Sequence, residues 1–304
     1  MENSNLLDIK YTTYLRGIAI LLIIIAHFAG GWTRYFTPCG GIGVAIFLFL
    51  SGYGINQSYK NNGLSYYFSK KIIRVVIPYF IIETIVFLFN EDFYLQEYVI
   101  DILGIKTRLW YIGFLYKQYI IYYILTKWFY KSRTSLFFII SFIILIYFPN
   151  IEAEQSFSFF TGFLVSQNNS FANKNINSKK IIVFAILLLL IGLTFLMIKQ
   201  LPQIRIYIDS YIYNIIQCFI KLPIGLFIIC FFTQLEYLRK NLIINYLGKI
   251  SYEVYLIHIY LFAYINHCIY RGFIIIGLSI ILAHIYYTFN KHLSYSIKSI
   301  LGIK

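Results

Sequence analysis

YLRGIAILLIIIAHF, residues 14–28, places two ionisable side chains in a stretch that is otherwise almost wholly apolar. Arg16 opens its central run and His27 closes it, with ten small or aliphatic residues between them. The surrounding segment, residues 11–32, is long enough to cross a bilayer as a helix, which takes about 20 residues. The stretch therefore predicts a membrane-spanning helix that carries two ionisable groups.

The rest of the chain repeats this apolar character. Of its 304 residues, 60% are hydrophobic and 12% are charged, whereas about 25% are charged in a typical soluble protein. Apolar runs recur from end to end, so we predict an all-α membrane protein of about ten transmembrane helices and a single domain, residues 1–304. The helices are expected over residues 11–32, 41–59, 75–90, 109–129, 135–149, 157–167, 181–198, 211–232, 250–268 and 273–290.

The charges predict the orientation of these helices. The net charge of +14 would suggest nucleic acid in a soluble protein, but cytoplasmic loops of membrane proteins collect Lys and Arg and face anionic lipid. With both termini in the cytoplasm, most basic residues fall inside and most acids outside. This orientation depends on the short run 157–167 crossing the membrane, because without that crossing the later basic loops would lie outside the cell. We therefore predict a multi-pass plasma-membrane protein whose partner is the lipid bilayer and not nucleic acid.

Two local details carry further structural predictions. Pro78 is expected in the first turn of the third helix, where proline is tolerated. The acidic stretch from Glu91 to Asp101 is expected to lie at the surface. The glycines of GGIGVAIFLFLSG, residues 40–52, enter an apolar helix and predict close helix packing, not a nucleotide-binding loop.

The sequence contains no metal-binding or cofactor motif. The four cysteines are scattered, and C-x-x-C, H-E-x-x-H, G-x-S-x-G and Walker patterns are absent. We therefore expect neither a metal site nor a resident cofactor.

Arg16 and His27 share one face of the first predicted helix. Eleven residues at about 100° each return to within roughly 20° of the start, and they separate the two residues by about 16 Å along the axis. Ionisable groups inside spans usually face a protein interior or a watery cavity and are functional by default. The alternatives are an interfacial anchor for Arg16 and a buried hydrogen-bonding histidine for His27.

Other ionisable groups lie in later spans. His258 follows Tyr255 by three residues, so the two are neighbours on one helix face. Glu83 lies in the third span, where it is expected either to pair with a cation or to act directly in catalysis. Lys70, Lys71 and Arg74 form a basic group that suits a phosphorylated ligand or, alternatively, a solvated cytoplasmic loop. A neutral imidazole, with a pKa near 6.5, suits general-base chemistry.

In combination, these residues resemble the acyltransferase 3 family of integral membrane acyltransferases. Its members typically show Arg or Lys, ten residues and then His in the first span, as Arg16 and His27 do here. A second-span element ending in SG-[YF] is similar to FLFLSGYGI, with Ser51 and Tyr53.

Two further elements carry the resemblance. The R-x-x-R element before the third span resembles residues 71–74, where Lys71 replaces the first Arg and cannot pair phosphate in a bidentate manner. GKISYEVYLIH, residues 248–258, is similar to the late G-x-x-SY-x-x-YL-x-H element. The resemblance covers essentially the whole chain in order.

The resemblance implies transfer of a short acyl group, most often acetyl. Cytoplasmic acetyl-CoA is the implied co-substrate, and a hydroxyl of a cell-surface or lipid-linked carbohydrate is the implied acceptor. Catalytic roles are expected for His27, Arg16 and His258, with His27 as the base or acyl acceptor. The residues expected to contact substrate are Lys71, Arg74, Ser51, Tyr53, Glu83 and Tyr255.

A proton-coupled glycan or lipid transporter is the alternative, with His27, Glu83 and Lys117 as its proton path. The chain shows no convincing internal repeat, which many transporter folds possess. The sequence leaves open the acceptor sugar, the acyl group, direct transfer against an acyl-enzyme, and whether the protein forms a homo-oligomer.

Overall fold

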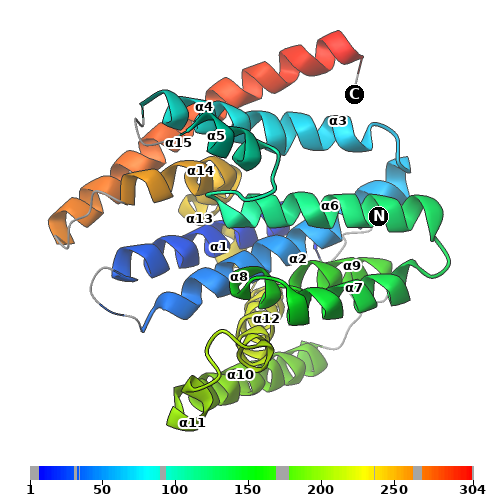
Figure 1. The fold of residues 1–304 in the computed structure, drawn as a ribbon, viewed down its shortest axis with the longest axis vertical. Coiled ribbons are helices and arrows are strands. Elements are labelled where there is room, and N and C mark those ends of the chain that lie inside the picture. The colour runs from blue at the N-terminus through cyan, green and yellow to red at the C-terminus, as the bar shows by residue number, and fades with distance from the viewer. Residues whose placement is uncertain are drawn as a thin grey trace. The chain divides into compact units, whose positions relative to one another are not determined.

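The structure, a computed structural model, describes residues 7–30, 33, 35–89, 94–168, 178–235, 237–262 and 269–302. Within these residues the regular structure is helical, and no strand occurs (Figure 1). The prediction of an all-α fold is confirmed.

The helices form two compact units, each built from two separate segments of chain. The first unit comprises residues 1–61 and 121–249, and the second comprises residues 62–120 and 250–304. The division falls within α6 (Trp110–Trp128), which contributes its first part to the second unit and the remainder to the first.

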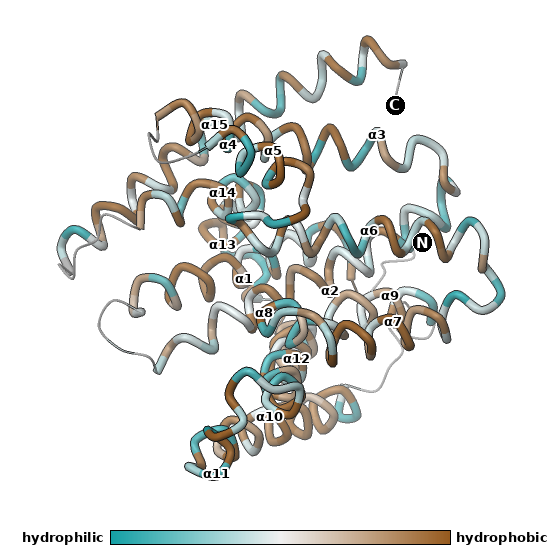
Figure 2. Tube along the Cα trace, viewed as in Figure 1, coloured by the Kyte–Doolittle hydropathy of each residue, from teal (hydrophilic) through white to brown (hydrophobic). Residues whose placement is uncertain are grey.

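Six stretches are long and apolar enough to cross a membrane, judged by length and composition. They are Ile9–Gly30 (α1), Thr37–Asn62 (α2), Tyr67–Phe89, Ser178–Gln200 (α10), Tyr211–Thr233 (α12) and Tyr270–Leu301 within α15 (Ile269–Leu301). Figure 2 shows how nearly continuous the hydrophobic residues are along α10. The count of about ten crossings and the cytoplasmic placement of both termini stay predictions.

The remaining helices of the described residues are shorter. They are α5 (Leu95–Ile102), α7 (Arg133–Tyr147), α8 (Asn150–Ala153), α9 (Ser158–Gln167), α11 (Pro202–Arg205), α13 (Leu242–Lys249) and α14 (Ser251–Phe262). The predicted short sixth span corresponds to α9, whose ten residues cover about 15 Å, about half of the hydrocarbon core. A full crossing at this point would need the flanking residues as well.

Glycines bring the helices of the first unit into close contact. A Cβ on Gly52 of α2 would collide with the Phe159 carbonyl, and a Cβ on Gly162 of α9 would collide with the Phe49 carbonyl. The two helices therefore pack backbone against backbone, which only glycine permits. This confirms the predicted close packing of the glycine-rich second helix.

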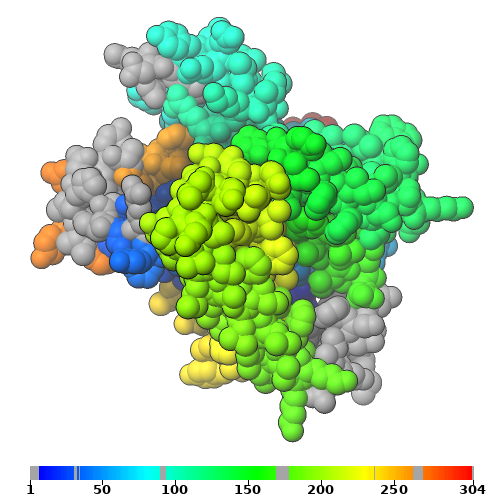
Figure 3. Space-filling model, turned by 60° about the horizontal axis from the view of Figure 1, so that its bottom comes forward, coloured from blue at the N-terminus to red at the C-terminus, as the bar shows by residue number. Residues whose placement is uncertain are grey.

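In the same unit, α10 packs along α12 and leaves its other side exposed. The exposed side carries Val183, Phe184, Leu187 and Leu190 (yellow-green in Figure 3). An apolar helix face of this length suits contact with lipid tails.

In the second unit, the helix that carries Lys71 and Arg74 continues without a break into the third predicted span. It runs as α3 (Tyr67–Lys71), a π-helical turn (Ile72–Val76) and α4 (Ile77–Phe89). The prediction that Pro78 lies in the first turn is therefore wrong. Proline has no N–H to bond the carbonyl four residues earlier and would clash with it, and the wider π turn relieves this conflict.

Candidate functional site

The first helix presents Arg16 and His27 on its exposed face. α1 is an unbroken α-helix from Ile9 to Gly30, so the eleven-residue spacing holds the two side chains within roughly 20° of one another. Both side chains are exposed, whereas Tyr14, Leu15 and Ile20 are buried. The structure therefore places His27 outside the core, unlike a buried structural histidine.

The opposite face of α1 is fixed to the rest of the first unit. Tyr11 donates a hydrogen bond from its hydroxyl to the Ile229 carbonyl of α12, and the Arg239 guanidinium lies 4.4 Å from the Tyr11 ring centre. A Cβ on Gly17 or Gly248 would meet backbone of the facing helix, so α1 and α13 are in close contact. These contacts set the direction in which Arg16 and His27 point.

The second-span residues Ser51 and Tyr53 belong to the same unit. Ser51 is half-buried, and Tyr53 is buried. They flank Gly52, the position at which α2 meets α9. Their predicted contact with substrate stays a prediction.

In the second unit, Lys71 and Arg74 lie on the helix that contains the π turn. The Lys71 ammonium lies 4.6 Å from the ring centre of Tyr119, and Arg74 is exposed. Lys70 and Arg74 are close enough to Lys298 of α15 to interact with it electrostatically. Lys298, which the sequence did not single out for function, therefore adds to this basic group.

Glu83 takes part in a buried network of carboxyl and phenol groups in the second unit. Tyr260 of α14 donates a hydrogen bond to Glu83 Oε1, and Tyr79 of α4 donates one to Asp101 Oδ1. The carboxyl groups of Glu83 and Asp101 also interact with each other. This network ties α4 to α5 and α14.

Asp101 corrects the expectation that the acidic stretch from Glu91 to Asp101 lies at the surface. Its side chain is only 2% exposed, and its Oδ1 also accepts a hydrogen bond of 3.2 Å from the Arg108 backbone N–H. Burial raises the pKa of the Asp101 carboxyl, and the hydrogen bonds from Tyr79 and Arg108 oppose part of that rise. Residues 90–93 of this stretch lie outside the described residues, and Glu97 is exposed as expected.

His258 is fully buried in α14. Its Nδ1 lies 3.0 Å from the Val254 carbonyl oxygen and 2.8 Å from that of Tyr255, which assigns the proton to Nδ1. The rings of Tyr255 and His258 are 5.6 Å apart, so their predicted proximity is confirmed. Tyr255 also packs edge-on against Tyr111 at 5.1 Å. The catalytic role of His258 stays a prediction.

The predicted site residues therefore divide between the units. The first unit holds Arg16, His27, Ser51 and Tyr53. The second unit holds Lys71, Arg74, Glu83, Tyr255 and His258.

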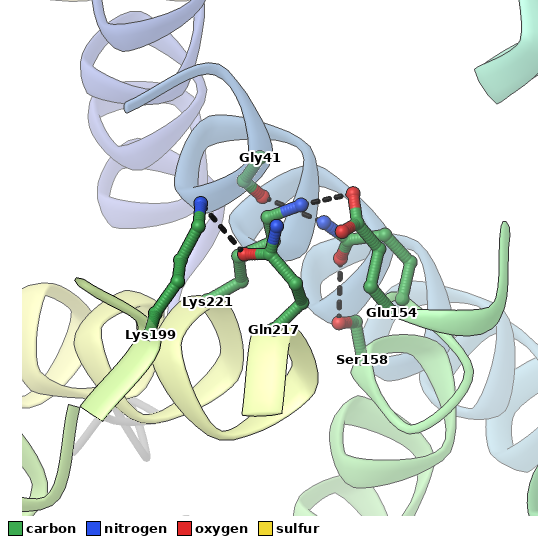
Figure 4. Close-up of polar contacts among 7 residues, drawn as sticks. Gly41, Glu154, Ser158, Lys199, Gln217 and Lys221 are labelled. Carbon is green, nitrogen blue, oxygen red and sulfur yellow. Dashed lines mark hydrogen bonds and ion pairs between the residues drawn. The ribbon is translucent and has the colours of Figure 1, made fainter. Parts of the chain in front are cut away.

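The sequence interpretation missed Lys221, which lies within the apolar helix α12. Its ammonium pairs with the carboxylate of Glu154, and both side chains are largely buried (Figure 4). A signal was present, because Lys221 is the single charged residue of the run from 211 to 233. Glu154 could not be recognised as its partner, since 66 residues of sequence separate the two.

A metal centre is not formed by the described parts of the chain, which bring together no group of three or more His, Cys, Asp or Glu side chains suited to a metal ion. The chemistry available at the exposed face of α1 is that of an imidazole and a guanidinium. These groups suit proton transfer and the binding of an anion, respectively.

Comparison with protein families identifies a family that covers most of the chain. A family model described as an acyltransferase domain matches residues 9–289. The matched residues include α1, the glycine-rich α2, the basic π-turn helix and α14. The chain matches no curated protein and no solved structure.

Proposed function

Since the chain belongs to the acyltransferase 3 family, we propose that it is a membrane O-acyltransferase of the plasma membrane. It moves an acetyl or similar short acyl group from cytoplasmic acyl-CoA to a hydroxyl of a cell-surface or lipid-linked carbohydrate. The observation that carries this proposal is the exposed face of α1, which offers a base at His27 and a cation at Arg16.

His27 acts as the general base in this proposal. Its imidazole takes the proton of the acceptor hydroxyl while the hydroxyl oxygen attacks the thioester carbonyl carbon. The C–S bond breaks, the CoA thiolate leaves, and the imidazolium returns the proton to that sulfur. One ester and one free CoA thiol result, with no net change in protons.

Arg16 holds the donor and does not touch the reacting atoms. It lies about 16 Å from His27 along the helix, too far to reach the same carbonyl group. The extended pantetheine arm of CoA spans such a separation, so the thioester reaches His27 while a phosphate of the donor pairs with Arg16. A guanidinium is suited to phosphate because it stays charged and donates two parallel hydrogen bonds.

Within the second unit, Lys70, Arg74 and Lys298 form a basic group of their own. The positive charges of Lys70 and Arg74 act on that of Lys298, and such like charges repel one another unless an anion or solvent lies between them.

Reconstitution into liposomes separates an enzyme from a carrier. We expect the purified protein to release free CoA from labelled acetyl-CoA and to label an added polysaccharide acceptor. Protein-free liposomes provide the control. Uptake of the glycan into the liposomes without any acyl donor, and without consumption of acetyl-CoA, would instead establish a transporter.

A further inference from the structure

A buried polar cluster lies where α8, α10, α12 and the start of α2 meet in the first unit (Figure 4). Lys221 pairs with Glu154, and the Gln155 side-chain amide donates to the Gly41 carbonyl over 2.8 Å. Ser158 Oγ donates to Gln155 Oε1 over 2.9 Å. Lys199 Nζ lies 3.4 Å from Gln217 Oε1. We call these seven residues, Gly41, Glu154, Gln155, Ser158, Lys199, Gln217 and Lys221, the Lys221 cluster.

The α12 side of this cluster is a polar stripe on an apolar helix. Asn214, Gln217 and Lys221 follow one another at spacings of three and four residues, so they share one face. Asn214 is 3% exposed, and its Oδ1 has no hydrogen-bond partner within the described structure. Burying an ion pair and an amide oxygen without a hydrogen-bond partner costs free energy. Apolar side chains of similar volume at these positions would give a more stable protein. The stripe therefore indicates a ligand-binding role.

The cluster lies beside the end of α1 that carries His27. A Cβ on Gly40 would lie 3.1 Å from the Ala26 methyl group, so the start of α2 packs against the residue that precedes His27. A Cβ on the next glycine, Gly41, would lie 3.0 Å from Lys221 Nζ. The start of α2 therefore lies between the end of α1 that carries His27 and the Lys221 side chain. In the predicted orientation this end of α1 faces the extracytoplasmic side, where the acceptor arrives.

The charges at the cluster favour an anion. Lys199 is half-buried and interacts electrostatically with two cations, Lys221 and Arg205, and one anion, Glu154. Its own contacts are uncharged, namely the Gln217 amide oxygen and the Tyr213 ring at 5.9 Å. An ammonium placed beside two other cations gains most from a ligand that brings a negative charge.

We propose that the Lys221 cluster is the acceptor subsite and that it takes a carbohydrate bearing an anionic oxygen group, either a carboxylate or a phosphate. Lys199 pairs with the anionic group, and the amide side chains and Ser158 bond the sugar hydroxyls. The inference rests on the proposed function, since it assigns the class of the acceptor.

Equilibrium binding by the purified full-length protein tests this assignment independently of catalysis. Three short oligosaccharides serve as probes: one with a uronate, one with a phosphate on the same backbone, and one with the uronate reduced to a neutral sugar. We expect at least one anionic probe to bind about tenfold more tightly than the neutral probe, as one charge-assisted hydrogen bond allows. Comparison of the two anionic probes identifies which group is recognised.

Variants locate the binding site. Lys199→Gln should abolish the preference for the anionic probe, while the affinity for the neutral probe changes less than about twofold. Lys180→Gln, at the opposite and exposed end of α10, should keep the preference. Lys221→Gln alone would leave the buried Glu154 carboxylate without its cation, so Lys221→Gln is combined with Glu154→Gln. This double variant should weaken the binding of all three probes.

Several results would overturn the inference: no probe binds the wild-type protein, anionic and neutral probes bind equally, or Lys199→Gln leaves the preference intact. The outcome is separable from that of the proposed function. Acyl transfer from acetyl-CoA without a preference for anionic acceptors would refute the subsite and keep the enzyme. A preference for anionic probes without any acyl transfer would refute the enzyme and keep the binding site.

Discussion

In the proposed mechanism, Arg16 and His27 perform different tasks because of the distance between them on α1. If Arg16 pairs with a phosphate of the donor, Arg16→Ala should raise the KM for acetyl-CoA about tenfold or more and change kcat less. An acetyl thioester of pantetheine, which lacks phosphate, provides the control. Equal loss of activity with both donors would contradict a role in phosphate binding.

The burial of Asp101 predicts how the stability of the protein depends on pH. Folding raises its pKa above the ordinary value of 3.8, so the stabilisation from the bound proton is complete below that pH and is lost as pH rises through the folded pKa. Asp101→Asn keeps a side-chain oxygen that can accept the hydrogen bonds from the Tyr79 hydroxyl and the Arg108 backbone N–H. Because asparagine does not titrate, the variant does not lose stability as the pH rises. The variant should therefore gain stability over wild type when the pH is raised from about 3.8 to about 8.

Thermal unfolding in detergent at these two pH values measures the effect. A variant that differs from wild type by the same amount at both pH values would show that folding does not raise the pKa of the Asp101 carboxyl.

At the scale of helices, the contact between α2 and α9 depends on the absence of side chains. A methyl group on Gly52 collides with the Phe159 carbonyl, so Gly52→Ala should force the helices apart and destabilise the protein by about 2 kcal/mol. Gly54→Ala is the matched control, because nothing lies near a Cβ at that position. It should be neutral or slightly stabilising, since alanine is the better helix former. Equal unfolding temperatures for the two variants would contradict the close packing.

The helices that were predictable from sequence are the long apolar ones. Arg16 and His27 could be placed on one face because an α-helix fixes that relation through local geometry alone. The burial of Asp101 and the pairing of Lys221 with Glu154 could not be predicted in the same way. They depend on contacts between segments far apart in the sequence, and no local pattern encodes which acid meets which base.

The π turn before Pro78 is another feature that could not be predicted from the sequence. Pro78 was expected in the first turn of a helix, where proline is tolerated, but a helix can also accommodate proline in a second way. The chain can start a helix at the proline, or it can continue through a widened turn. The structure has the second, which joins the basic residues and the apolar span in one continuous helix.

For the whole molecule, the proposed reaction requires a donor inside the cell and an acceptor outside it. The predicted even number of crossings would place both termini on the same side, and the distribution of Lys and Arg predicts that this side is the cytoplasm. Peptide tags fused to the two ends should therefore both be protected from protease added outside intact cells and digested after permeabilisation. Digestion of one tag in intact cells would contradict the predicted orientation.

The His27 imidazole is proposed to act as the general base of acyl transfer. The direct measurement is the initial rate of CoA release in liposomes with acetyl-CoA and an acceptor glycan, for wild type, His27→Ala and His292→Ala. His292 is an exposed histidine of α15 and serves as the matched control. We predict a loss of at least about 100-fold for His27→Ala, typical of removing a general base, and an unchanged rate for His292→Ala. A His27→Ala protein that inserts normally and still transfers acetyl groups at the wild-type rate would contradict the claim.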